Sequence, residues 1–356
     1  MRGRRAFIAF SLFVLSICAF SGRISQGGTL ASHPADKEIG HSQPDCSAAN
    51  NVYANCHCRQ AAITPKLVVH NSNDPKDVLQ FNAWLHRSAD AIQLFGGRAD
   101  WSDWKNSLDW MATLFNSAPI DIMWSVPLIP LGASLEAAAQ GDYNQRYSEL
   151  AQQFIGHYGS TKKINIRLGW EFNGKGWTPW SAVGKAAQYK AAYREFVKAF
   201  RDVASNFVFE WTPNIGDVGM NPELAYPGDD VVDIVGLDFY YNTAWDPHDP
   251  IQAWNYFVSE KYGLQWHQDF AAAHHKVTAY AEWGVNSDAA GPFILQAAKW
   301  FSSHGIVYHS YWNSNADFAG RLSDNQYPNA GAAYRSAFGA SSSASGAASG
   351  VDCPKP

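Results

Sequence analysis

The sequence predicts a single (β/α)8 barrel, an α/β TIM-barrel fold, because of the chain's length, its alternating segments and the character of its strand-like runs. The chain has 356 residues, of which 46% are hydrophobic and 17% charged, so it can bury a large core. Eight apolar runs of strand length alternate with segments of helical spacing. The runs are continuously apolar, which is typical of parallel strands buried on both faces. Eight such units over roughly 250–280 residues match this barrel.

The expected strands are residues 66–71, 91–96, 120–127, 164–173, 207–214, 231–241, 277–284 and 305–313. The expected helices are residues 77–88, 101–116, 134–158, 181–205, 251–274 and 288–304. Only the connection between the fifth and sixth strands is thin, with a short segment at 222–226. A doubly wound sheet is the main alternative, but no Gly-rich phosphate loop follows the first strand.

The N-terminus has the features of a secretory signal peptide, expected at residues 1–21. Three arginines precede an apolar stretch at 6–20, and small residues follow it. The stretch is short for a membrane span. Removal of the three arginines would change the formal net charge from −5 to −8. We expect a secreted or periplasmic protein, with lipoprotein attachment at Cys18 and an uncleaved anchor as lower-ranked alternatives.

A loop-rich leader is expected at 22–63, the catalytic domain at 64–338 and a flexible Ser/Ala/Gly tail at 339–356. Four cysteines remain outside the signal peptide, namely Cys46, Cys56, Cys58 and Cys353. In an exported chain they indicate two disulfides that tether the leader and the tail. Cys46 is expected to pair with Cys56 or Cys58, and Cys353 with the other. A metal site at residues 56–58 is the competing interpretation, but its spacing fits no common zinc pattern.

The composition also restricts the class of ligand. Aromatic residues make up 14% of the chain, including 15 tryptophans, and indole rings stack well on the apolar faces of sugars. The negative net charge provides no basic field for nucleic acid. We therefore expect a polysaccharide or oligosaccharide partner, no nucleic acid, no membrane contact after signal cleavage, a monomer, and neither a cofactor nor a metal ion.

Two glutamates each follow an apolar run and lie among tryptophans. Glu171 lies near the end of the fourth expected strand and Glu282 near the end of the seventh. A carboxylate among indoles is costly to bury, so such a position usually has a use. Strands four and seven lie on opposite sides of a barrel mouth, where catalytic groups gather at the carboxyl ends of strands. Two facing carboxyl groups are what the cleavage of a glycosidic bond requires.

Other polar and aromatic residues are expected near the same rim. Those at strand ends are Asn71, Trp124, Asn214, Asp238, Tyr240, Trp312 and Asn313. The candidates for sugar binding are His70, Trp170, Asn173, Trp177, Trp180, Tyr240, Trp245, Trp283 and Trp312. Asp238 has two interpretations, a structural bond to Arg167 or contact with substrate. The tryptophans on helical faces are expected in the core; they are Trp84, Trp110 and Trp300.

These motifs resemble glycoside hydrolase family 26. The segment 167–174, followed by Trp177 and Trp180, is similar to that family's acid/base segment. The stretch 226–238, with Tyr240 just beyond it, resembles its sixth strand, and 281–284 its nucleophile strand. The likeness covers residues 64–338.

The resemblance implies a clan A retaining glycosidase, usually endo-acting on β-linked polysaccharides and most often on β-1,4-mannan. It implies that Glu171 is the acid/base and Glu282 the nucleophile. Tyr240 would orient Glu282, and Trp312 would form the floor of the −1 sugar subsite. Trp170 is a departure, because the family's mannanases carry His immediately before the acid/base.

That departure leaves other substrates open, namely mixed-linkage β-glucan, β-1,3-xylan or a bacterial exopolysaccharide. An exo-acting or transglycosylating enzyme on the same barrel is a further alternative. A protein that binds carbohydrate without cleaving it is the alternative from another class, although binding alone needs aromatic rings and not two opposed carboxylates.

Overall fold

The computed structural model describes residues 64–116 and 120–340. The expected signal peptide, most of the leader, all five cysteines and most of the tail lie outside these residues. No helix in the described part of the chain has both the length and the apolarity that a bilayer span requires.

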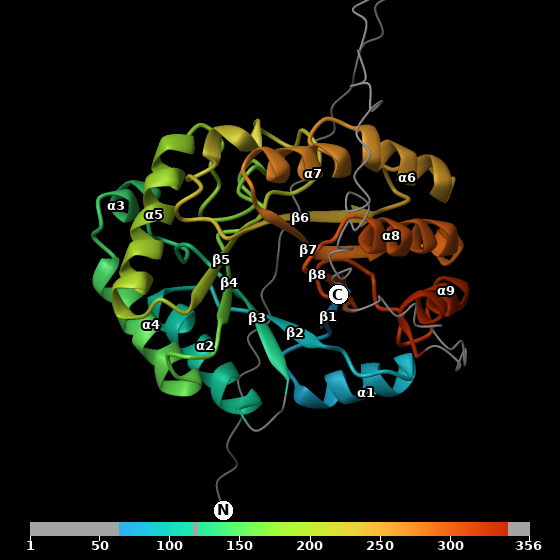
Figure 1. Ribbon diagram of the computed structural model, residues 1–356, viewed down its shortest axis with the longest axis horizontal. Coiled ribbons are helices and arrows are strands. Elements are labelled where there is room, and N and C mark those ends of the chain that lie inside the picture. The colour runs from blue at the N-terminus through green and yellow to red at the C-terminus, as the bar shows by residue number, and fades with distance from the viewer. Residues whose placement is uncertain (1–63, 117–119, 341–356) are drawn as a thin grey trace, which may run out of the picture. The chain divides into compact units, whose positions relative to one another are not determined.

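Eight parallel strands close into one barrel in chain order, as the sequence predicts (Figure 1). The strands are β1 (Lys66–His70), β2 (Ala91–Phe95), β3 (Asp121–Val126), β4 (Ile164–Leu168), β5 (Phe207–Trp211), β6 (Ile234–Tyr241), β7 (Val277–Val285) and β8 (Tyr308–Trp312). The ring closes where β1 pairs with β8, with Lys66 opposite Tyr308 and His70 opposite Trp312. The predicted (β/α)8 fold is therefore confirmed.

Helices surround the barrel (Figure 1). They are α1 (Pro75–Leu85), α2 (Trp101–Phe115), α3 (Leu135–Ala139), α4 (Asn144–Tyr158), α5 (Ala186–Val203), α6 (Pro250–Ser259), α7 (Leu264–Ala273), α8 (Gly291–Ser303) and α9 (Pro328–Phe338), with 3-10 turns η1 (Pro222–Ala225) and η2 (Asp288–Ala290). Several begin at a side-chain cap: Asp74, Asp100 and Asp249 accept bonds from the first backbone N–H groups of α1, α2 and α6.

Two expected helices are each divided in the structure. The segment 134–158 forms α3 and α4, because Gly141 between them has φ +84°. The segment 251–274 forms α6 and α7, separated by a turn in which Tyr262 has φ +59°. Helix α9 lies in a stretch for which no helix was expected, and it packs on α8.

Side chains alternate between the barrel interior and the surrounding helices, as in any closed barrel. The outward side chains join the helices in one large core. The lower interior forms a separate apolar layer, consisting of Val68, Ala91, Met123, Ile234, Ala279, Ala281 and Tyr308. Nearer the carboxyl ends of strands β2 to β8, the inward side chains are polar: Gln93, Ser125, Arg167, Glu210, Asp238, Glu282 and Ser310. The fold thus places its buried polar groups toward one end of the barrel.

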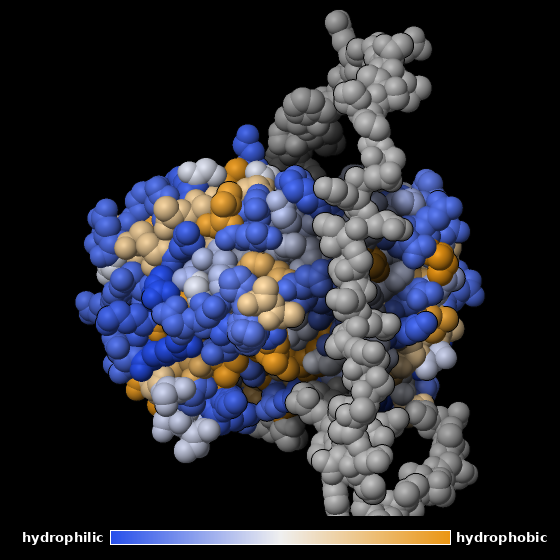
Figure 2. Space-filling model, turned by 45° about the horizontal axis from the view of Figure 1, so that its top comes forward, coloured by the Kyte–Doolittle hydropathy of each residue, from blue (hydrophilic) through white to orange (hydrophobic). Residues whose placement is uncertain are grey.

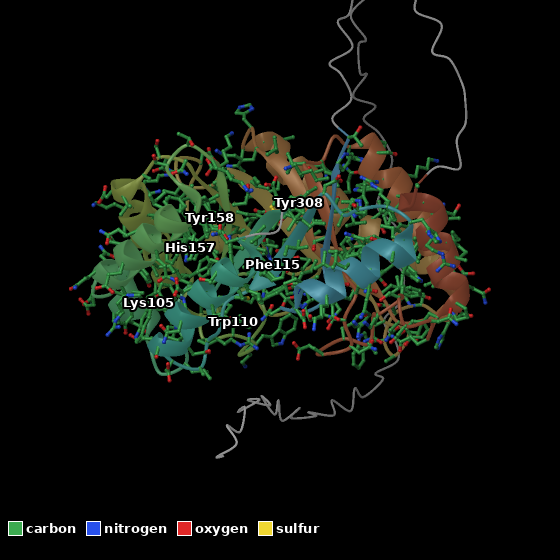
Figure 3. The ribbon with its side chains drawn as sticks, turned by 90° about the horizontal axis from the view of Figure 1, so that it is seen from below. Lys105, Trp110, Phe115, His157, Tyr158 and Tyr308 are labelled. Carbon is green, nitrogen blue, oxygen red and sulfur yellow. The ribbon has the colours of Figure 1, made fainter. Side chains whose placement is uncertain are left out.

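Helices α2 and α4 lie side by side, joined by one ion pair and one histidine–aspartate hydrogen bond, and Trp110 lies on the same flank (Figure 3). Lys105 Nζ is 3.1 Å from Glu149, and His157 Nε2 is 2.8 Å from Asp109. The prediction that Trp110 is a core residue is wrong, because its side chain is 55% exposed. Hydrophilic residues dominate the face shown in Figure 2, with hydrophobic ones interspersed.

Candidate active site

Glu171 is carried by a strained turn immediately after β4. The expected fourth strand is too long: β4 ends at Leu168, because Gly169 has φ +55° and Glu171 φ +51°. A left-handed conformation is unfavourable for glutamate, and such strain is concentrated at functional sites. The Glu171 N–H donates to the Thr212 carbonyl at 2.9 Å, which ties the turn to the end of β5. The turn therefore directs Glu171 to the barrel mouth and not along the strand.

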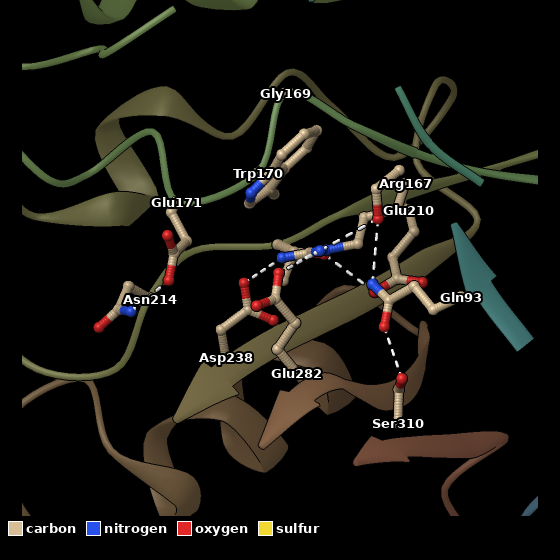
Figure 4. Close-up of polar contacts among 12 residues, drawn as sticks. Gln93, Arg167, Gly169, Trp170, Glu171, Glu210, Asn214, Asp238, Glu282 and Ser310 are labelled. Atoms are coloured by element: carbon tan, nitrogen blue, oxygen red, sulfur yellow. Dashed lines mark hydrogen bonds and ion pairs between the residues drawn. The ribbon is translucent and has the colours of Figure 1, made fainter. Parts of the chain in front are cut away.

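The Glu171 side chain is partly buried and has one direct hydrogen-bond donor (Figure 4). Asn214 Nδ2 donates to its Oε1 at 2.6 Å. Burial, and next the nearby charge of Glu282, raise the pKa of Glu171 to about 7, against the opposing effects of Asn214, Arg167 and Arg98. A carboxyl group of this kind holds a proton near neutral pH and can donate it to a leaving group.

Glu282 points into the barrel because β7 contains a bulge. Gly236 and Asp238 of β6 pair with Ala279 and Glu282, so β7 has one extra residue over this stretch. The pairing of β7 with β8 shifts in the same place, between Tyr280 and Trp283. The extra residue turns Glu282 inward and Trp283 outward, as bulges beside active sites commonly re-aim a side chain.

Two groups hold the inward carboxylate of Glu282, which is 6% exposed. Tyr240 donates from its hydroxyl to Oε2 at 2.5 Å, as the sequence analysis expected. Arg167 Nη1 donates to Oε1 at 2.6 Å. Two donors, one of them cationic, therefore hold both carboxylate oxygens in position, as a nucleophile requires.

The planar guanidinium group of Arg167 connects several side chains of the site (Figure 4). Its Nη1 contacts Glu282 and also Ser125 Oγ at 3.2 Å, while Nη2 pairs with Asp238. Asp238 is completely buried, so the structural interpretation of this residue, a bond to Arg167, is correct. The guanidinium also lies 5.2 Å from the ring centre of Trp170.

Aromatic rings surround these groups. Trp312 stacks on His70 with ring centres 4.4 Å apart and donates from Nε1 to the Phe318 carbonyl at 3.2 Å. Phe95 lies edge-on to Trp170, His70 and Trp312. Phe318 packs on Tyr240 at 4.6 Å. His70, Trp170, Tyr240 and Trp312 therefore lie together, with Phe95 and Phe318 added by the structure.

Neither Phe95 nor Phe318 was among the residues expected at the site from the sequence. Phe95 ends β2 on the same face as inward Gln93, so strand alternation could have identified it. Phe318 lies in the loop after β8, where no periodic pattern exists.

Two tryptophans assigned to sugar stacking are in the interior instead. Trp283 and Trp180 are both 0% exposed. Trp283 packs outward against Tyr311 and Phe301, and Trp180 lies behind Trp170, donating to its carbonyl at 2.7 Å. The expectation that they stack on sugar is therefore wrong, because no face of either ring is accessible.

Among the remaining candidates, Trp177 is 42% and Trp245 79% exposed, so both have free ring surface. Asn173 is fully buried and acts by holding loops together: its Nδ2 donates to the Asn214 carbonyl at 2.8 Å. Trp124 is 1% exposed and packs outward on Phe154, so it does not line the rim.

The described residues contain no group of three or more His, Cys, Asp or Glu side chains suited to a metal ion.

A closed (β/α)8 barrel with a proton-holding Glu171 and a cation-bound Glu282 at its mouth has the architecture of a glycoside hydrolase. Comparison with known proteins agrees: residues 140–262 match the model of glycosyl hydrolase family 26. This stretch of the chain is therefore similar to glycosyl hydrolase family 26, in agreement with the resemblance seen in the sequence.

Solved structures with the same fold include mannanases of this family. The catalytic domain of an endo-β-1,4-mannanase from Bacillus sp. JAMB-750 gives a TM-score of 0.56 at 18% identity, covering 78% of this chain and 87% of that one. A Bacillus subtilis mannanase gives 0.54 at 14% identity, with coverage of 78% and 86%. A Bacteroides ovatus β-mannanase gives 0.52 at 14% identity, with coverage of 76% and 90%.

Among curated proteins, Endoglucanase H of Acetivibrio thermocellus is 27% identical over 301 residues. The match covers 74% of this chain but only 31% of the relative, so the chain spans about a third of that protein's length.

Proposed function

We propose that the protein is a retaining endo-β-glycosidase that hydrolyses a β-linked polysaccharide, with β-1,4-mannan as the first candidate. The observation that supports this most is the contrast between its two glutamates. Glu171 has a pKa of about 7, whereas Glu282 receives hydrogen bonds from Arg167 and Tyr240. One carboxyl group is thus prepared to give a proton and the other to attack.

In the proposed first step, a Glu282 oxygen attacks the anomeric carbon while Glu171 protonates the departing glycosidic oxygen. The C–O bond to the leaving group breaks, and a glycosyl ester forms on Glu282. In the second step, Glu171 takes a proton from water, which attacks the same carbon and releases Glu282. Two inversions return the original configuration, and the enzyme regains both starting protonation states.

The aromatic residues give this proposal a place for the sugar. Trp312, held by His70 and by its bond to the Phe318 carbonyl, would form the floor beneath the sugar to be cleaved. Trp177 and Trp245, both exposed, would contact sugars further along the chain. Export to the periplasm or medium, supported by the basic and apolar N-terminus, would bring the monomeric enzyme to such a polymer.

β-Glucan is the second substrate candidate, favoured by the match to Endoglucanase H over 74% of the chain. Trp170 also supports β-glucan as a candidate substrate, because this ring borders the guanidinium group of Arg167, which holds Glu282. Replacing the His of the family's mannanases with an indole changes both shape and polarity there.

The test is product analysis on galactomannan, glucomannan, mixed-linkage glucan, β-1,3-xylan and cellulose. We expect oligosaccharides of mixed length from one of these polymers, and a loss of at least roughly 1,000-fold for Glu171→Gln on that natural substrate and for Glu282→Gln. Glu260→Gln is the matched control, because burial raises the pKa of Glu260 to about 7 as well, at the end of α6. Binding by calorimetry without any product would instead indicate a carbohydrate-binding protein.

A further inference from the structure

Three neutral polar side chains inside the barrel lead to Arg167, and the proposed mechanism does not use them. They are Ser310 on β8, Gln93 on β2 and Ser125 on β3, here called the Gln93 network. Each is at most 1% exposed. Figure 4 shows Ser310, Gln93 and Arg167 in the same part of the interior. Because the network is enclosed by the barrel, it can influence the reaction only through Arg167 or another neighbour.

Each contact in the network has a defined donor and acceptor. The Ser310 hydroxyl donates to Gln93 Oε1 at 2.5 Å. Gln93 Nε2 donates to Ser125 Oγ at 3.0 Å, and the same oxygen accepts from Arg167 Nη1 at 3.2 Å. Since Ser310 holds the amide oxygen of Gln93, the amide nitrogen is directed at Ser125. The network therefore fixes the oxygen atom that Arg167 meets.

Ser125 is the neutral partner of a guanidinium that otherwise pairs with acidic groups. Arg167 Nη1 donates to Glu282 Oε1 at 2.6 Å, and Nη2 pairs with Asp238. No acceptor for Arg167 Nε lies among the described residues. Nη1 carries two protons in the guanidinium plane, so Glu282 and Ser125 together set its direction. A displacement of Ser125 would therefore change where Arg167 holds Glu282.

The fold itself has little need of polar groups at these positions. An amide and two hydroxyl groups lose water on burial, and their mutual bonds only recover that loss. Apolar side chains of the same shape can fill such a space at nearly equal stability. Two residues earlier on the same strands, the inward side chains are indeed apolar, namely Ala91 on β2 and Met123 on β3. The position of the network beside Arg167 is thus its distinguishing feature.

The main chain of Gln93 serves another part of the site. Its carbonyl accepts a bond from His70 Nδ1 at 3.0 Å, and the His70 ring stacks on Trp312. This bond does not involve the Gln93 side chain. A substitution of that side chain should therefore disturb Arg167 and leave the proposed sugar floor in place.

We propose that Gln93 is a positioning residue for the nucleophile: it holds Ser125 against Arg167, and Arg167 holds Glu282. This inference rests on the proposed function, because it takes Glu282 as the attacking group. Attack requires an aligned carboxylate, whereas binding of the polymer depends on the aromatic rings. Loss of the network allows the guanidinium and the carboxylate to shift together, so attack slows while the substrate still binds.

The test is the steady-state kinetics of Gln93→Met, which keeps an unbranched side chain but has no amide. We expect kcat to fall roughly 10-fold, because small displacements of a reacting group are costly, with KM within about twofold. Ser125→Ala should lower kcat at least as much. Gln93→Met/Ser310→Ala leaves neither partner of the amide bond unpaired, so it should fold and show the same loss even if Gln93→Met alone does not fold.

Gln268→Met is the matched control. Gln268 of α7 also connects two hydroxyl groups: it donates to that of Tyr280 at 3.0 Å and accepts from that of Thr278 at 3.4 Å. Both partners alternate along β7 with inward Ala279, so they point out of the barrel. The kcat of Gln268→Met should equal that of the wild type. An unchanged kcat in the Gln93 variants, or an equal loss in Gln268→Met, would overturn the proposal.

A double-mutant cycle determines whether Gln93 acts through Arg167. Arg167→Lys removes the fork that reaches Ser125 and Glu282 together. In that background, Gln93→Met should lower kcat by less than about twofold. A further loss as large as that in the wild-type background would contradict a path through Arg167.

NMR of the arginine guanidinium groups separates this inference from the proposed function, since it needs no substrate. In protein labelled with 15N at these groups, Arg167→Lys identifies the Arg167 signals. They should be resolved in the wild type, where Glu282, Ser125 and Asp238 hold the Nη protons, and should broaden through faster rotation in Gln93→Met but not in Gln268→Met. A wild type that cleaves none of the polymers would refute the proposed function, whereas Arg167 signals unchanged in Gln93→Met would refute the role of Gln93.

Discussion

Asn214 donates a hydrogen bond of 2.6 Å from its Nδ2 to Oε1 of Glu171. Its own backbone is held by Asn173, whose Oδ1 accepts from the Asn214 N–H at 2.8 Å. The loop after β4 and the end of β5 are therefore fixed to each other. The bond favours the ionised form of Glu171, while burial and Glu282 favour its neutral form, and the balance leaves the pKa at about 7. Glu171 can consequently both give and accept a proton near neutral pH.

The first prediction concerns the alkaline limb of the pH profile. Glu171 must be protonated to act as the acid, so kcat/KM should fall as the pH rises above about 7. Asn214→Ala removes the bond that favours the charged form, so the limb should move to higher pH while kcat decreases. Asn206→Ala is the control, because that side chain bonds to the carbonyls of Gly159 and Lys162, away from the site. An alkaline limb unchanged by Asn214→Ala would contradict this account of Glu171.

The second prediction concerns stability. The folded protein raises the pKa of Glu171 from 4.5 to about 7, so between these values it binds more protons than the unfolded chain. Its stability should therefore fall as the pH rises through this window. Glu171→Gln removes that cost and should be more stable than the wild type at pH 8, by up to about 3 kcal/mol.

Urea unfolding at several pH values measures this difference. The gain should shrink as the pH is lowered and disappear below the ordinary pKa of glutamate. Equal stability of the two proteins at pH 8 would mean that burial does not penalise the Glu171 charge.

The third prediction concerns Arg167. Arg167→Lys keeps the charge but loses the planar fork that reaches Glu282 and Asp238 together. We expect kcat to fall at least about 100-fold, because the nucleophile is no longer held in position. Arg194→Lys provides the control, since Arg194 makes a two-pronged pair with Asp230 at the surface, with both distances 2.7 Å. Comparable losses in the two variants would argue against a specific role for Arg167.

The fourth prediction separates two classes of tryptophan. Trp283→Ala should cost about 3–5 kcal/mol of stability, because it empties a completely buried site. Trp245→Ala should leave stability within about 0.5 kcal/mol, because that ring is 79% exposed, while raising KM for long substrates. Thermal unfolding and steady-state kinetics on oligosaccharides of increasing length measure the two effects. A KM independent of Trp245 at every length would exclude this ring from the binding surface.

The barrel could be predicted from the sequence because parallel strands buried on both faces have a recognisable sequence pattern, a continuous run of apolar residues. The ends of the helices and strands were harder to predict from the sequence, since they depend on single backbone torsion angles. Glu171 has φ +51° although it is not glycine, and this ends β4 earlier than its apolar neighbours suggest. Trp110 was misjudged because helical spacing identifies a residue's face but not whether a neighbour covers that face.

Glu171 and Glu282 could be predicted as a catalytic pair from the sequence. Whether the side chains next to them point into the barrel or out of it could not. Glu282 and Trp283 are adjacent, and strict alternation over β7 would direct only one of them inward. The extra residue near Ala281 decides which one, and nothing in its composition signals a bulge. Gln93 was not identified as a site residue, because a single glutamine in an apolar strand has no partner nearby in sequence; Ser310 is 217 positions away.

Double displacement by Glu171 and Glu282 fixes the configuration of the first-formed product, and this configuration can be measured. A β-linked oligosaccharide of the preferred polymer is cleaved in an NMR tube, and the anomeric proton signals are followed from the first minutes. If the configuration is retained, the β-anomer appears first and the α-anomer grows in only later by mutarotation. Initial release of the α-anomer would show inversion and would contradict a covalent intermediate on Glu282.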